Sequence, residues 1–197
     1  MLDGSKVTAL VVGGGAVALR KIRALLDGGV HVAVIAPEVN SELRLLAERE
    51  PRLTVTRGAY SDGHIADATL VIAATDDAAV NARVAGDATR QHRLVNVVDA
   101  PGIGTFLTPA VHRAGDLTIA IFTGRLPAAA AAIRDAVAGR FDGRYAAAIA
   151  EVRDLRDRLL ASGERAEWKA ISDELLGGSF CADVESGSLE AKVAPWR

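Results

Sequence analysis

The amino-acid sequence predicts an α/β fold in which a parallel β-sheet is covered by helices on both faces. In the first half of the chain, short runs rich in β-branched residues alternate with longer amphipathic segments, as expected for strands and helices in turn. The short runs are continuously apolar, which is typical of strands buried on both sides. The 197 residues suffice for one full domain and an appendage.

The elements of the first half follow from these runs. Strands are expected at residues 6–12, 30–36, 53–56, 68–73 and 94–98. Helices are expected where apolar side chains recur at helical spacing, at residues 16–26, 41–49 and 77–90. Gly28 and Gly29 end the first helix, and Pro37 breaks the second strand.

The pattern changes after Pro101. Beyond a turn at 102–104 we expect two strands separated by residues 112–116, at 105–110 and 117–122. The remaining helices are expected at 128–137, 145–160 and 164–176. The tail after Gly177 is rich in glycine and serine, and we expect it to be flexible.

Charge and cysteine content exclude several classes of protein. The chain has 23 basic and 25 acidic residues, a balance that does not attract nucleic acid or an anionic membrane nonspecifically. Its single cysteine, Cys181, excludes an internal disulfide framework and an all-thiolate metal cluster. The sequence contains neither a signal-peptide pattern nor an apolar run long enough to span a bilayer, so we expect a cytoplasmic protein.

A glycine-rich turn joins the first strand to the first helix. Gly13, Gly15 and Ala18 match the pattern G-x-G-x-x-A. In this pattern the first glycine permits the tight turn, the second lets a pyrophosphate approach the backbone, and the alanine permits close packing of helix on sheet. The turn predicts a Rossmann-type dinucleotide-binding domain, the alternative being a plain strand–helix connection.

Two further loops bear on the cofactor. The second strand ends at Pro37-Glu38 with no carboxylate at the usual position for the ribose hydroxyls. Glu38 either takes that role or is an exposed residue ahead of the next helix, and no arginine follows for a 2′-phosphate, which favours NAD over NADP. After the fourth strand, Thr75 and Asp76 are expected to line the site, while Asp77 caps the following helix.

The fifth strand runs directly into Asp99, which is followed by Ala100-Pro101. Because the carboxyl ends of parallel strands share one edge, Asp99 is expected at the same edge as Gly13 and Thr75. There it can serve as a general base, or it can be a residue that initiates a turn. No His, Cys or Tyr is expected in a proton-relay position near Asp99.

Together these motifs resemble one family. The quoted segments are 12–18 with Arg20-Lys21, 73–77 with Val80-Asn81, and 96–101 with Phe106 and Pro109-Ala110. Over roughly residues 5–160 they are similar to the siroheme-synthase dehydrogenase family, whose members are precorrin-2 dehydrogenases and, in some cases, also sirohydrochlorin ferrochelatases. The resemblance implies a homodimer that uses NAD to oxidise precorrin-2 to sirohydrochlorin.

The resemblance also assigns residues. Asp99 matches the catalytic aspartate of the family. The candidates for cofactor binding are Gly13, Gly14, Gly15, Ala16, Val17, Pro37, Glu38, Thr75, Asp76, Asn96 and Val98. A dimer is also favoured by the apolar character of the second region, which includes Ile119, Ile121, Ile133 and Val137. The expected fold is thus a Rossmann-type domain (1–112), an α+β dimerisation and substrate-cleft region (113–143) and a helical C-terminal region (144–197).

One segment departs from the family pattern. Where a serine is usual before the proline, this chain has Leu126, preceded by Thr123, Gly124 and Arg125. The lost hydroxyl leaves open which tetrapyrrole is bound and whether iron or cobalt is inserted. Arg125 and Arg113 either contact substrate carboxylates or are solvated, and the substrate-binding candidates are Arg113, Thr123, Gly124 and Arg125.

No permanent metal site is expected. The four histidines, His31, His64, His92 and His112, lack ligand spacing and are interpreted as structural or surface residues, although His112 lies near the junction and is a weaker candidate for the cleft. Two alternatives remain: the same scaffold acting on a different substrate, or a noncatalytic module that senses NAD.

Overall fold

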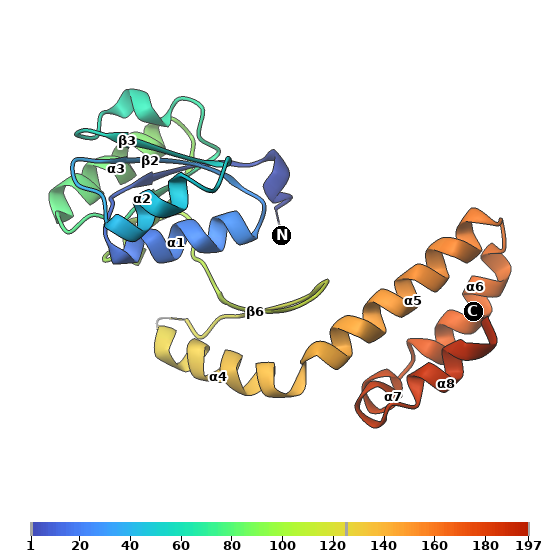
Figure 1. The fold of residues 1–197 in the computed structure, drawn as a ribbon. Coiled ribbons are helices and arrows are strands. Elements are labelled where there is room, and N and C mark those ends of the chain that lie inside the picture. The colour runs from blue at the N-terminus through green and yellow to red at the C-terminus, as the bar shows by residue number, and fades with distance from the viewer. Residues whose placement is uncertain (1, 125, 197) are drawn as a thin grey trace. The chain divides into compact units, whose positions relative to one another are not determined.

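The computed structural model describes residues 2–124 and 126–196 (Figure 1). The chain divides into two compact units between Thr108 and Pro109. Each unit is described by itself below.

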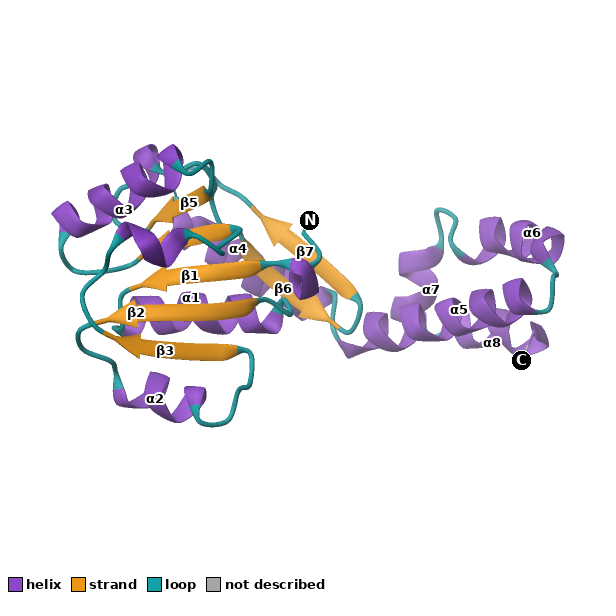
Figure 2. Ribbon diagram, turned by 90° about the horizontal axis from the view of Figure 1, so that it is seen from above, coloured by secondary structure: helices purple, strands orange, loops and turns teal. Residues whose placement is uncertain are grey.

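The first unit is built on a five-stranded sheet (Figure 2). Its strands are β1 (Thr8–Val12), β2 (His31–Ala36), β3 (Leu53–Arg57), β4 (Leu70–Ala73) and β5 (Leu94–Val97). All neighbouring strands are parallel, and their order is β3-β2-β1-β4-β5. From β1 the chain adds β2 and β3 on one side, and it then adds β4 and β5 on the other side. The strand order therefore reverses between β1 and β4, and ligands bind in such sheets beyond the carboxyl ends of the strands at this switch point.

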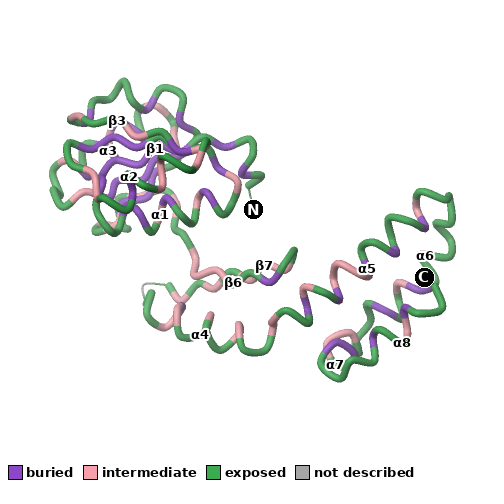
Figure 3. Tube along the Cα trace, viewed as in Figure 1, coloured by how far each residue is buried: buried purple, intermediate pink, exposed green. Residues whose placement is uncertain are grey.

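Helices cover the sheet on both faces, as expected from the sequence. They are α1 (Ala16–Asp27), α2 (Ser41–Ala47) and α3 (Ala78–Arg90). On one face, Ile22 of α1 and Leu43 of α2 are fully buried in a cluster with Val11. On the other face, Val84 of α3 is fully buried with Val71. The buried trace in Figure 3 is concentrated in these strands and in the helix faces that cover them.

The expected strand at 105–110 is wrong. Instead, the main-chain N–H groups of Thr105 and Phe106 both donate to the carbonyl of Val95, at 2.7 and 3.3 Å, so this segment lies along β5. The next strand is β6 (Ala110–Ala114), which pairs antiparallel with β7 (Leu117–Ile121).

The turn of the β6–β7 hairpin lies within residues 112–116, which we expected to separate two strands. Ala114 pairs with Leu117, so the loop has two residues, Gly115 and Asp116. Gly115 has φ +58°, the left-handed conformation that such a tight turn demands. A Gly-Asp pair is a recognised hairpin signal, and it places the turn inside 112–116.

Helices make up the rest of the second unit. They are α4 (Pro127–Arg140), α5 (Gly143–Ala161), α6 (Arg165–Leu175), α7 (Phe180–Ser186) and α8 (Leu189–Val193). In the part of the chain that the structure describes, no helix combines the length and the apolar character needed to cross a membrane.

The flexible tail expected after Gly177 is also wrong. Val184, Leu189 and Val193 of the two last helices are buried in one cluster with Leu155 of α5. Cys181 is half-buried against the same cluster rather than lying in a mobile segment.

A buried carboxylate ties α7 to α8. Asp183 accepts hydrogen bonds from Lys192 Nζ and Ser188 Oγ, both at 2.7 Å. The bond from Lys192, followed by those from Ser188 and Ser179, lowers the pKa of Asp183 to about 2. These contacts hold the two C-terminal helices together. Their connections are rich in glycine and serine, which is why the sequence predicted a flexible tail.

Candidate functional site

The glycine turn is packed between two neighbouring loops. Gly13 has φ +125°, and a Cβ atom there would lie 2.3 Å from the carbonyl oxygen of Ala74, just after β4. A Cβ on Gly14 would lie 2.2 Å from the carbonyl oxygen of Glu38, just after β2. Both positions therefore require glycine because backbone approaches backbone. The loops after β1, β2 and β4 meet at the carboxyl edge of the sheet.

Gly15 differs from its two neighbours, because a Cβ there would have no heavy atom within 4 Å. It is exposed and forms the N-cap of α1, where no side chain caps the helix and the first turn carries no acidic residue. The first intrahelical bond runs from Leu19 N to Gly15 O, so the N–H groups of residues 16–18 precede it. Ala16 and Val17 are exposed, whereas Ala18 is fully buried against the sheet. An open, uncapped helix start with this backbone geometry fits a pyrophosphate.

Asp99 is exposed at the same edge, two residues after the end of β5. Its Oδ1 accepts a hydrogen bond of 3.1 Å from Nδ2 of Asn81 in α3. In the described residues no salt bridge involves its carboxylate. The acid is thus held at one oxygen and accessible to solvent.

Asn81 connects this acid to the loop after β4. The amide also bonds to Thr75, whose own loop carries Ala74, the residue against which Gly13 packs. A continuous chain of contacts therefore runs from the glycine turn through Thr75 and Asn81 to Asp99. The turn and the acid thus lie at the same edge of the sheet.

The remaining cofactor candidates fall into two groups. Pro37, Glu38 and Asp76 are exposed in the loops after β2 and β4, and Thr75 is half-buried. Asp77 caps α3, as expected, by accepting bonds from the N–H groups of Ala79 and Val80.

Asn96 and Val98 lie further inside. Asn96 is 4% exposed, and its Nδ2 donates to the carbonyl of Phe106 at 3.0 Å, while its Oδ1 is buried with no partner among the described residues. Its amide therefore holds the segment after Asp99 against β5. Val98 is half-buried against the α1 side of the core, and its N–H donates to Ala73 O at 3.1 Å.

Lys21 of α1 fixes the end of the same segment. Its ammonium donates to the hydroxyl of Thr108. Burial, with a smaller contribution from the positive charge of Arg20, lowers the pKa of Lys21. The chain between Asp99 and the end of the first unit is thus held at Phe106 and at Thr108.

The four substrate candidates lie in the second unit. Arg113 is exposed on β6 and donates to Thr118 Oγ1 at 3.1 Å. The hydroxyl of Thr123 donates to the carbonyl of Leu126, and Gly124 has φ +61° with open space around it. Arg125 lies outside the described residues. His112 of this unit is engaged locally, because its Nε2 lies 2.6 Å from the carbonyl of Phe141.

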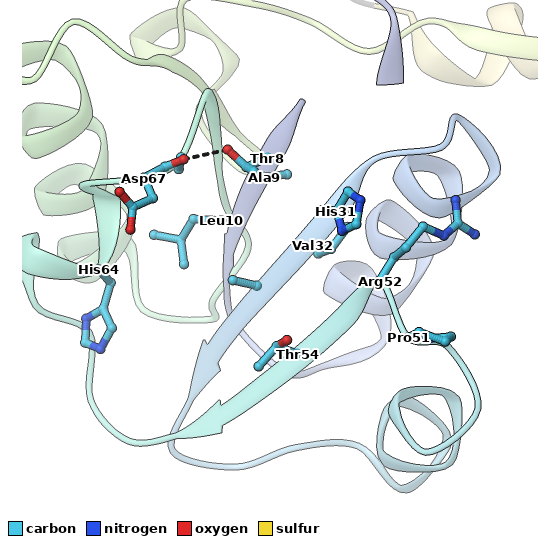
Figure 4. A pocket seen from close by; sticks show the side chains of 12 residues that line it. Thr8, Ala9, Leu10, His31, Val32, Pro51, Arg52, Thr54, His64 and Asp67 are labelled. Carbon is cyan, nitrogen blue, oxygen red and sulfur yellow. Dashed lines mark hydrogen bonds between the residues drawn. The ribbon is translucent and has the colours of Figure 1, made fainter. Parts of the chain in front are cut away.

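A hollow of about 270 Å³ lies on the sheet elsewhere in the first unit (Figure 4). His31, Arg52, His64 and Asp67 contribute to its lining, together with Thr8 at the start of β1. The starts of β1 and β2 border it, so it is separate from the carboxyl edge that carries Asp99. Among the described residues no group of three His, Cys, Asp or Glu side chains could hold a metal ion.

Asn81 is the site residue that sequence reasoning did not assign. A signal existed, because Asn81 shares the helix spacing of Val84, Ala85 and Ala88, all of which are buried. A polar side chain on the core face of a helix needs polar partners. What the sequence did not reveal was that one of those partners is Asp99, 18 positions further along the chain.

These features define a class of protein: a dinucleotide-binding α/β domain with an accessible carboxylate at its ligand-binding edge. The model of the family described as "Putative NAD(P)-binding" matches residues 1–110. The chain belongs to this family.

Similar proteins make the relationship more specific. Over 98% of its length the chain is 36% identical to a siroheme synthase of Nitrosospira multiformis, of which it covers 42%. Over 62% of its length it is 44% identical to a siroheme synthase of Pseudomonas fluorescens, of which it covers 26%. The chain therefore spans less than half the length of these relatives.

A solved structure described as "SirC, precorrin-2 dehydrogenase" matches over almost the whole chain. The match covers 97% of this chain and 98% of the other, with a TM-score of 0.73 and 26% identity. Together with the siroheme synthases, it confirms the resemblance that the motifs indicated, and it confirms the α/β fold followed by a helical C-terminal region.

Proposed function

We propose that the protein oxidises precorrin-2 to sirohydrochlorin with NAD as the hydride acceptor. The observation that carries the proposal is the contact chain that joins the glycine turn to Asp99 through Thr75 and Asn81. It brings a cradle for a dinucleotide and an accessible base to one edge of the sheet. The near full-length similarity to a precorrin-2 dehydrogenase supports the substrate.

The cofactor's pyrophosphate would bind at Gly15 and at the start of α1, where the backbone is open and uncapped. Glu38 lies beside Gly14 and is the acid available for the adenosine ribose. A carboxylate there accepts bonds from ribose hydroxyls and repels a 2′-phosphate, which favours NAD. When bound, the nicotinamide supplies the hydride-accepting chemistry.

Asp99 would take the proton that the substrate loses when its hydride leaves. Asn81 occupies Oδ1, so Oδ2 is the oxygen available for that proton. An exposed carboxylate becomes a better base when a bound substrate covers it and removes water. The substrate would thus lose a hydride to the cofactor and a proton to Asp99.

The second unit carries the candidate residues for substrate binding. A tetrapyrrole carries several carboxylates, and Arg113 and Arg125 are candidates to bind them. Thr123 and Gly124 belong to the same part of the chain. We also propose that two chains form a homodimer through this unit, whose surface includes Phe122 and Ile133, 58% and 44% exposed. A monomeric mass in light scattering at micromolar concentration would exclude the dimer.

The decisive experiment is anaerobic incubation with precorrin-2 and NAD, followed by absorbance. We expect the wild-type protein to form sirohydrochlorin, and the Asp99→Ala variant to bind NAD normally in titration calorimetry but to turn over poorly. Unchanged turnover by Asp99→Ala would exclude Asp99 as the base. NADP is titrated in parallel, and tighter binding of NADP would overturn the preference for NAD. Iron or cobalt is added afterwards as a separate assay of chelatase activity.

A further inference from the structure

We propose that Asn81 is a positioning residue that orients Asp99 and couples it to the cofactor-binding loop after β4. This inference rests on the proposed function of Asp99 as a base. Its starting point is a side-chain amide that is 1% exposed inside α3 and touches both the acid and the loop.

The amide of Asn81 uses its full hydrogen-bonding capacity. Oδ1 accepts from the N–H of Thr75 at 3.1 Å and lies 2.8 Å from the hydroxyl of Thr75, whose one hydrogen is shared with the carbonyl of Asp77 at 3.0 Å. Nδ2 donates to the carbonyl of Thr75 at 3.0 Å and to Oδ1 of Asp99 at 3.1 Å. An asparagine amide has two donors and two main acceptor positions, so every one is engaged.

These partners also fix which way the amide faces. A main-chain N–H can only donate, so the atom of Asn81 that faces the N–H of Thr75 must be the oxygen. The NH₂ group is then directed to the carbonyl of Thr75 and to Asp99. A flipped amide would place its NH₂ group against the N–H of Thr75, and its oxygen against both the carbonyl of Thr75 and the carboxylate of Asp99, which makes the observed orientation the stable one.

Asp99 needs such a partner because its own surroundings restrain it little. It is exposed and follows the end of β5, where the chain leaves the sheet. A donor held rigidly in a helix restricts the carboxylate to one orientation. Pre-orientation of this kind raises the rate of a proton transfer without adding a contact to the substrate.

The same amide holds the loop that carries Thr75. Movement of this loop against the cofactor would therefore be transmitted to Asp99 through one rigid side chain. In contrast, a plain structural role would require Asn81 only to satisfy the backbone of Thr75, and would predict no effect on the behaviour of Asp99. The two interpretations differ in what loss of the Asn81 donor does to the carboxylate of Asp99.

The test compares Asn81→Asp and Asn81→Ser with the control Val84→Ala. Asn81→Asp keeps the shape but replaces the donor with a second carboxylate, and Asn81→Ser leaves a hydroxyl too short to reach Asp99. Val84→Ala removes buried volume from the same helix face without touching the acid. Thermal unfolding measures how much stability each of the three variants loses, so that their kinetics can be compared at similar stability.

Two measurements follow. In the apoprotein, ¹³C NMR of labelled aspartate, assigned with Asp99→Asn, should show a changed chemical shift for the Asp99 carboxylate in Asn81→Ser, because this variant removes the hydrogen bond to its Oδ1. In the assay, both Asn81 variants should lower kcat about tenfold to hundredfold, the effect expected for losing one charged hydrogen bond. The KM for precorrin-2 should change little.

Val84→Ala should leave the chemical shift of the Asp99 carboxylate at its wild-type value. A shift in Asn81→Ser equal to that of wild type would overturn the inference, as would Asn81 variants whose kinetics match those of Val84→Ala. The NMR measurement needs no turnover. A wild-type protein without dehydrogenase activity would therefore refute the proposed function while the positioning of Asp99 is still measured.

Discussion

Replacing Gly15 with alanine should abolish tight NAD binding while leaving the fold intact. The backbone of Gly15 has φ −85° and ψ −172°, an extended conformation open to any residue. A Cβ there would meet no protein atom within 4 Å. The only group that the new methyl displaces is the phosphate that approaches the start of α1 in the proposed complex.

The expected magnitudes separate stability from binding. Alanine is a slightly poorer N-cap than glycine, but it lowers the entropy of the unfolded chain, so the free energy of unfolding should change by less than about 1 kcal/mol. Losing one charged hydrogen bond between phosphate and backbone costs about 1.5–3 kcal/mol, or roughly 10- to 150-fold in the dissociation constant. Steric exclusion of the phosphate would increase this loss.

Calorimetric titration with NAD and thermal unfolding measure the two quantities. Gly63→Ala is the matched control, because its Cβ also has no neighbour within 4 Å and lies outside the site. Gly13→Ala is the contrasting variant: its Cβ overlaps the carbonyl of Ala74 and its φ is +125°, so it should lose stability as well as binding. If Gly15→Ala bound NAD as tightly as Gly63→Ala does, the helix start would not be the phosphate site.

Three further predictions concern stability. Asp77→Ala should lower the free energy of unfolding by about 1 kcal/mol through loss of the α3 cap, seen in urea unfolding, and a larger loss would mean that Asp77 does more than cap. Leu189→Ala should destabilise the second unit by about 2–5 kcal/mol, lowering its melting temperature, whereas a flexible tail would show no change. Asp183→Asn should lower the melting temperature at neutral pH. The pKa of Asp183 is lowered to about 2 in the folded protein, whereas it is about 3.9 in the unfolded chain. The ionised carboxylate therefore stabilises the fold fully above about pH 3.9, and this stabilisation is lost as the pH falls through 2. The melting difference between Asp183→Asn and wild type should therefore shrink between these pH values, and a constant difference would contradict the assignment.

The sequence predicted the first unit well because its strands are buried on both faces. Residues 70–73, for example, are all buried in the structure, so each of them has to be apolar. This continuous apolar run is easily distinguished from an amphipathic helix, in which polar residues recur. The glycine turn was equally readable, since Gly13 and Gly14 are required by backbone contacts that no other residue permits.

The errors arose where tertiary contacts decide the structure. Thr105 and Phe106 belong to an apolar stretch, but their N–H groups are taken by Val95, so they form no strand with the later chain. The last two helices are short and joined by glycine and serine, and they are held by burial of Leu189 and Val193 against α5 and by Asp183. Local composition carries none of this information.

The prediction of NAD over NADP was limited for the same reason, because residues that are neighbours in the sheet can be far apart in the sequence. No arginine follows β2 in the sequence, which favoured NAD. Yet Arg57, the last residue of β3, pairs in register with Ala36, the last residue of β2, and is exposed. A parallel neighbour strand thus brings Arg57 to the same edge of the sheet as Glu38, the acid we assign to the ribose. A positive charge at this edge would attract a 2′-phosphate, whereas the carboxylate of Glu38 would repel it. The proposed preference for NAD therefore depends on both residues, and we expect replacement of Glu38 alone to shift binding toward NADP.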